Sequence, residues 1–248
     1  MFQSKIVLSI STALLFSALA HASQQVSTIE QLRDAFSKEH GLTPLDATTK
    51  EEVDTALTVC NITEPIIILQ DEHSTNSACY QLGQETKNPI KVMAIGVADK
   101  QGRASQYYIC HSILHELGHL VAGDLENIPT AIPFYREYVL RKLECNADIF
   151  AIKKLMALND YYTIAYAFLD FTYHCDAGKS NCADEYWLIH DHPGYRERAQ
   201  IILDQLRAAK VDLKNLPIDA SKHADKDAMQ QKFIQQITKY FPEYLKSE

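Results

Sequence analysis

The pattern of apolar and polar positions predicts a mostly helical chain with two short strands. Helices are predicted at 27–39, 49–59, 105–122, 134–158, 159–173, 195–207 and about 226–240. Runs of β-branched residues predict strands at 64–69 and 91–97. This order of elements predicts an α+β fold with a small β-sheet, whose second strand comes just before the helix at 105–122.

The first 22 residues follow a different pattern. A short polar start that holds Lys5 precedes an apolar stretch at 6–20, and Ala-His-Ala at 20–22 is a small-x-small cleavage site. These features are typical of a secretory signal peptide, and the alternative is a retained membrane anchor. We therefore expect an exported protein, periplasmic or secreted, in which residues 23–248 form a single domain without a membrane span.

The helix predicted at 105–122 contains the motif His-Glu-Leu-Gly-His at 115–119. His115 and His119 are four residues apart and therefore share one helix face, where both imidazoles can bind one metal ion. Glu116 lies one step round the helix, where it can act as a general base on a water at the metal. The alternative is a core helix with two incidental histidines.

A second motif, Glu-Cys-Asn-Ala-Asp at 144–148, begins 25 positions after His119 in another predicted helix. Catalytic zinc usually takes three protein ligands and a water, so Glu144 is the predicted third ligand. Asp148 is expected to accept the other N–H of a ligand histidine. Asp124 is a less favoured third ligand. The alternative interpretation treats Glu144 and Asp148 as solvated helix acids.

Two features restrict the type of metal site. His111 lies four residues before His115, but it cannot share an ion with His119, because eight residues of helix span about 12 Å. We expect it to pack in the core or to support a ligand. Metzincins need Gly and His three and six places after His119, where this chain has Ala122 and Leu125. The pattern is therefore two histidines and a distant glutamate.

These blocks, HELGH and ECNADIFAIKKL, resemble the HExxH…ExxxD arrangement of gluzincins related to the CAAX prenyl proteases and to bacterial periplasmic and membrane quality-control proteases. The segment 190–198, His-Asp-His-Pro-Gly-Tyr-Arg-Glu-Arg, is similar to the family's His-Pro block. The resemblance covers roughly residues 90–207. It implies a zincin-like catalytic core, one Zn²⁺ per chain and endopeptidase activity on peptides or proteins. Family members commonly carry membrane helices, which this sequence lacks after residue 22.

Peptide hydrolysis also needs a hydrogen-bond donor for the developing oxyanion. His192, Arg198 and Tyr195 are the candidates, and the resemblance favours His192 and Arg198. The alternative is a helix start with Pro193 in its first turn and a structural arginine. The strand at 91–97 is expected to lie at a sheet edge and to pair with an extended substrate; the alternative is an internal strand.

The net charge argues against some classes of partner, and the cysteine content indicates the cellular compartment. The formal net charge is −8, or −9 without the single lysine of the leader, which argues against nucleic acid and anionic lipid as partners. All six cysteines follow the leader, and an even number in an exported chain favours disulfides. The predicted pairs are Cys175–Cys182, Cys110–Cys145 and, by elimination, Cys60–Cys79. Cys110 and Cys145 are alternatively zinc ligands.

The sequence thus favours a zinc-dependent endopeptidase that acts on exported or periplasmic proteins, with Glu116 as general base. One alternative is a latent gluzincin-like zinc-binding module with a chaperone or interaction role, in which His190 or His192 occupies the fourth zinc position. Another is a zinc hydrolase of cell-wall peptides or amides. The sequence leaves open the oligomeric state and whether residues 23–60 form a removable pro-segment.

Overall fold

The computed structural model describes residues 29–74, 77–82, 90–99, 102–103, 106–124, 133–176 and 193–246. The helices are α2 (Ile29–His40), α3 (Ala47–Cys60), α4 (Gln106–Ala122), α5 (Pro133–Ala157), α6 (Tyr161–Asp176), α7 (Tyr195–Ala208) and α8 (Lys226–Tyr240), with a 3-10 turn at Pro242–Leu245. The strands are β1 (Ile66–Asp71), β2 (Ala78–Leu82), β3 (Ile90–Gly96), β4 (Ala98–Asp99) and β5 (Gly102–Arg103).

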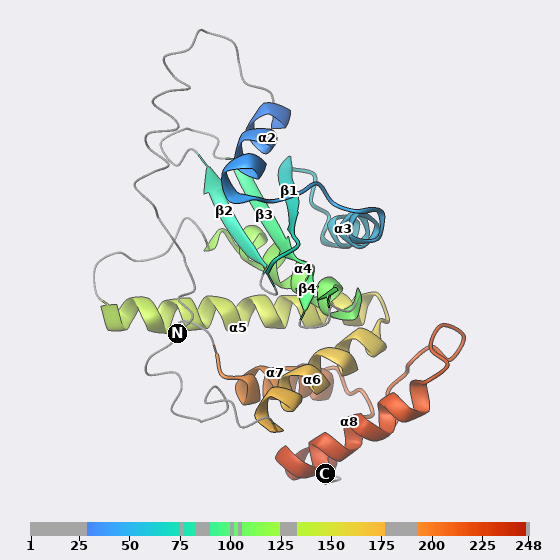
Figure 1. Ribbon diagram of the computed structural model, residues 1–248. Helices are drawn as coiled ribbons and strands as arrows, with labels where there is room; N and C mark the ends of the chain where they lie inside the picture. The colour runs from blue at the N-terminus through green and yellow to red at the C-terminus, as the bar shows by residue number, and fades with distance from the viewer. Residues whose placement is uncertain are drawn as a thin grey trace, which may run out of the picture.

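The predicted α+β class is confirmed, with most described residues in helices and a small sheet beside α4. Each predicted helix is present, although its ends differ by a few residues from the prediction. Figure 1 shows the sheet with α2 and α3 on one side of the long helix α5, and α6, α7 and α8 on the other. None of the helices in the described part has the length and apolar character that crossing a membrane requires.

The main sheet has three strands in the order β1-β3-β2. β1 pairs with β3 in parallel, and β2 pairs with β3 antiparallel. The prediction that 91–97 is an edge strand is therefore wrong, because β3 has a partner on both sides. Within the described residues, the edge strand next to α4 is β2, which lies in the polar stretch at 70–89 and was not predicted.

Side chains alternate between the two faces of the sheet, as the pleat of a strand requires. Val92 and Ala94 belong to a smaller core that Phe36 of α2 closes. Met93 and Ile95 point into the larger core, to which α3 and α4 contribute. The sheet is thus a layer between α2 and the α3–α4 pair.

This layering bears on the question of whether residues 23–60 form a removable pro-segment. Phe36 of α2 and Val53 of α3 are both buried, one in each core. Loss of residues 29–60 would uncover apolar side chains on both faces of the sheet. The structure thus makes α2 and α3 part of the folded domain.

The disulfides predicted between helices are absent. Cys60, Cys79, Cys110 and Cys145 are all free, so the predicted Cys110–Cys145 and Cys60–Cys79 bridges are wrong. The two thiols on α4 and α5 face different neighbours, because Cys110 interacts with Glu52 of α3 and the Cys145 Sγ lies 3.9 Å from a Glu197 oxygen of α7. Cys182 lies outside the described residues, so its pairing with Cys175 stays a prediction.

Leu117 of α4 is fully buried in the larger core, and it tests this core. We expect Leu117→Ala to lower the free energy of unfolding by about 3 kcal/mol, since it deletes buried methyl groups and leaves a cavity. The matched control is Val121→Ala, one turn later on the same helix, where the side chain is 54% exposed; its effect should stay within about 0.5 kcal/mol. Urea unfolding measures both, and equal losses would contradict this packing.

Candidate metal centre

Helix α4 carries three histidines on one face. Its residues 106–117 contain no Gly or Pro, and the helix stops where Gly123 takes a left-handed φ of 69°. His111, His115 and His119 are buried although the helix also packs an apolar face into the core. Buried histidines need hydrogen-bond partners, and most of these come from α5.

The two helices approach closely at Gly118, between the two motif histidines. A Cβ atom at Gly118 would lie 3.1 Å from the Cα of Ala147 and 3.3 Å from side-chain atoms of Phe150, both on α5. The absence of a side chain therefore lets the α5 backbone come against α4. This contact brings Glu144, which lies one turn before Ala147 on α5, to the imidazoles.

His115, His119 and Glu144 form a group whose ligand atoms lie within 4.8 Å of one another. The Nε2 atoms of the two histidines are 3.3 Å apart. Glu144 oxygens lie 3.1 Å from Nε2 of His115 and 3.5 Å from Nε2 of His119. A tetrahedral ion with bonds of about 2.1 Å holds its ligand atoms about 3.4 Å apart. The predicted trio is therefore brought together and can hold a metal ion.

The Nδ1 atoms of His115 and His119 face away from this group and also have hydrogen-bond partners. Nδ1 of His115 lies 2.8 Å from Oδ1 of Asp148, as the sequence predicted. The carboxylate accepts the Nδ1–H, which leaves Nε2 of His115 free to bind a metal. The interpretation of Glu144 and Asp148 as solvated acids is wrong, because Asp148 is buried and the Glu144 side chain is only 15% exposed.

Asp124 occupies the corresponding place behind the other histidine. Its Oδ2 lies 2.9 Å from Nδ1 of His119, and the side chain is buried. Asp124 therefore lies outside the metal group and is not the third ligand, a position that Glu144 takes. The sequence signal for this role was the Gly-Asp pair directly after the helix, which allows the chain to turn back toward His119.

Arg198 of α7 contacts Asp148 next to His115, because its Nη2 and Nδ1 of His115 share Oδ1 of Asp148 and lie 3.5 Å apart. Its Nε and Nη2 atoms donate to the two oxygens of Asp148 at 2.8 and 2.6 Å, and its guanidinium lies over the ring of Phe171. Burial opposes the ionised carboxyl, but Arg198 and His115 hold the pKa of Asp148 well below its usual range. Two of the donors of Arg198 are thus engaged by Asp148, which gives this residue a positioning role.

The carboxylates also change the protonation of the ligand histidines. Burial alone would lower the pKa of His115, but Asp148 and Glu144 outweigh it and raise the pKa to about 9. For His119, Asp124 and Glu144 likewise outweigh burial and raise the pKa to about 10. Without a metal, the carboxylates thus favour protonation of both histidines, and a metal ion must compete with protons for them.

The Glu116 side chain interacts with the Cys79 thiol of β2. The Cys79 thiol of β2 donates to the main-chain oxygen of Glu116 at 3.3 Å, and Ser112, one turn earlier, donates to Ser77 at 2.9 Å. Residues 77 and 79 point to the same face of the strand, so the edge strand follows the helix over one turn. The candidate general base is thus placed between the metal group and the sheet edge.

His111 has the packing role that the sequence predicted. It lies edge-on to Phe171 and 6.4 Å from the His115 ring, and its Nε2 is buried without a hydrogen-bond partner among the described residues. Burial lowers its pKa to about 3. His111 is therefore a neutral core residue and does not join the metal group.

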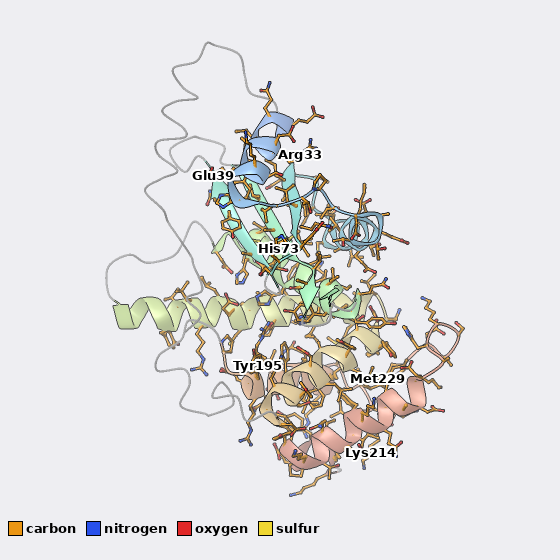
Figure 2. All side chains as sticks on the ribbon, in the orientation of Figure 1. Arg33, Glu39, His73, Tyr195, Lys214 and Met229 are labelled. Atoms are coloured by element: carbon orange, nitrogen blue, oxygen red, sulfur yellow. The ribbon has the colours of Figure 1, made fainter. Side chains whose placement is uncertain are left out.

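The block at 190–198 is only partly described. His190 and His192 lie outside the described residues, so their predicted roles stay predictions. Tyr195 begins α7, and its ring stacks on His174 of α6 at 4.5 Å. Figure 2 shows Tyr195 on the α6–α7 side of α5, whereas His73 lies on the side of the sheet.

Comparisons of the chain with family models, with curated proteins and with solved structures find no match. The resemblance of the three sequence blocks to the gluzincins therefore stays a prediction. The case for a metal centre rests on the geometry of His115, His119 and Glu144 and on the carboxylates behind the two imidazoles.

Gly118→Ala tests the close contact of α4 and α5. In an ordinary helix this change stabilises by about 1 kcal/mol, because alanine is the better helix former. Here the new Cβ presses on the Ala147 backbone, so we expect a loss of about 1–3 kcal/mol together with weaker metal binding. Chemical unfolding and a metal titration measure the two effects. An increase in stability would show that α5 does not come this close.

His111 makes the metal-free protein sensitive to acid. Its pKa is about 3 when folded and about 6.5 when unfolded, so the unfolded chain binds more protons between these values. Stability is then present above pH 6.5 and lost as pH falls toward 3, by about 2 kcal/mol at pH 5. We expect His111→Leu to remove this part of the loss in urea unfolding at pH 7.5 and 5. Identical pH dependence in both proteins would contradict the assignment.

Proposed function

We propose that this protein is a zinc-dependent endopeptidase that cleaves exported or periplasmic proteins. The observation that carries the proposal is the buried His115–His119–Glu144 group with Glu116 next to it on the same helix. Three protein ligands with a neighbouring carboxylate are typical of catalytic zinc, whereas structural zinc usually has four.

The donor set supports zinc over harder cations. Two imidazole nitrogens and one carboxylate suit Zn²⁺, while Mg²⁺ and Ca²⁺ prefer oxygen ligands. When bound, zinc would lower the pKa of a water and polarise the carbonyl of the scissile bond. His115, His119 and Glu144 would hold it, and Asp148 and Asp124 would fix both imidazoles with Nε2 toward it.

The remaining chemistry belongs to side chains of the chain itself. Glu116 takes a proton from the attacking water and returns it to the departing amine. Arg198 keeps Asp148 ionised and in place, and through it orients His115. His192 remains the proposed donor to the oxyanion.

The sheet edge suggests how a peptide lies in the site. β2 runs along α4 beside Glu116, and within the described residues it pairs on one side only, with β3. An extended peptide can add to such an edge through main-chain hydrogen bonds. We therefore propose that the substrate pairs with β2. The sequence had predicted this pairing for the strand at 91–97.

Two variants test the proposal. Glu116→Gln removes the base but none of the metal ligands, so it should bind zinc like the wild type and lose at least about 100-fold in the cleavage of an unfolded protein. His119→Ala removes a ligand, so it should lose both the zinc and the cleavage. Zinc content by elemental analysis and gel-based proteolysis are the measurements.

The results separate the alternatives. Zinc in the wild type with equal proteolysis by wild type and Glu116→Gln would favour the latent zinc-binding module. Cleavage of cell-wall peptides but of no protein would favour the other zinc hydrolase. The absence of zinc from the wild type, even after remetallation, would reject all three.

A further inference from the structure

The two ligand histidines are held by carboxylates in different electrostatic settings. Asp148 comes from α5, and both of its oxygens accept from Arg198. Asp124 follows α4 directly, and the only partner of its side chain among the described residues is His119. One carboxylate is thus shared between a guanidinium and a histidine, and the other contacts a histidine alone among the described residues.

The two contacts also differ in what they hold together. Asp148 links α4, α5 and α7, because it contacts His115 and Arg198 at once. Asp124 lies only five residues after His119, and the left-handed Gly123 turns the chain so that the carboxylate faces back. Loss of Asp148 therefore affects the packing of three helices, whereas loss of Asp124 affects one histidine.

We propose that Asp124 is a positioning residue that sets the metal affinity of the site through His119. A carboxylate on the outer nitrogen of a ligand histidine orients the ring and increases its donor strength. An uncompensated charge does this more strongly than a charge already shared with a guanidinium. The inference rests on the proposed zinc site and concerns what tunes it.

Asp124→Asn is the sharpest test, because it has the same shape and keeps an oxygen that accepts from Nδ1–H but lacks the charge. We expect zinc to bind about 10- to 100-fold more weakly, with a smaller fall in the melting temperature of the metal-free protein than Asp148→Asn causes. Asp148→Asn should instead lower that melting temperature clearly, because it leaves Arg198 buried without its ion pair.

The dissociation constant is measured by competition of Zn²⁺ with a chromophoric chelator, and the visible spectrum of the Co²⁺-loaded protein reports the ligand geometry. Asp227→Asn is the matched control, since Asp227 is exposed on α8, which packs against α6. It should leave affinity, spectrum and melting temperature unchanged. Asp124→Glu keeps the charge and should recover part of the affinity that Asp124→Asn loses.

The outcomes separate this inference from the proposed function. Zinc binding by the wild type with equal affinity in Asp124→Asn overturns the role of Asp124 alone. A fall in the metal-free melting temperature as large as that of Asp148→Asn also overturns it, since the residue would then be structural. A wild type that binds neither Zn²⁺ nor Co²⁺ rejects the zinc site itself and the role of Asp124 with it.

Discussion

The site depends on the close contact of α4 with α5 at Gly118. Glycine at this point allows the Ala147 backbone to come within van der Waals contact of α4. The axes of packed helices lie about 8–10 Å apart depending on the side chains at the contact, and a larger residue at position 118 would push Glu144 away from the histidines. One missing side chain therefore decides whether Glu144 meets His115 and His119.

Around that contact the protein buries several carboxylates. Glu116, Glu144, Asp124 and Asp148 all lie close to the two histidines, and Arg198 pairs with Asp148. Burying charges costs free energy unless partners compensate. In the metal-free protein the compensation comes from protonation of the histidines, whose pKa values rise to about 9 and about 10. A divalent cation offers the same compensation without protons.

Local patterns in the sequence were sufficient for the helices and for most of the site. Helical spacing places His115 with His119, and Glu144 with Asp148, so the sequence predicted both pairs and the contact of Asp148 with a ligand histidine. The sequence did not predict the features that depend on pairing between residues far apart in the chain. The strand β2 is short and lies in a polar stretch, and its pairing with β3 made the predicted edge strand a central one. The cysteine bridges failed because sequence distance does not show which neighbour each thiol faces.

The fourth metal position is what separates an enzyme from a latent module. The described residues bring three ligands together, and Asp124 is turned to the outer nitrogen of His119. A fourth ligand from the described residues would have closed the site, as in structural zinc centres. Glu116 would then have no water to act on, and its place between the metal group and the edge strand β2 would serve no reaction. The three-ligand arrangement with a base beside a strand edge is what the proposed hydrolysis of an extended peptide requires.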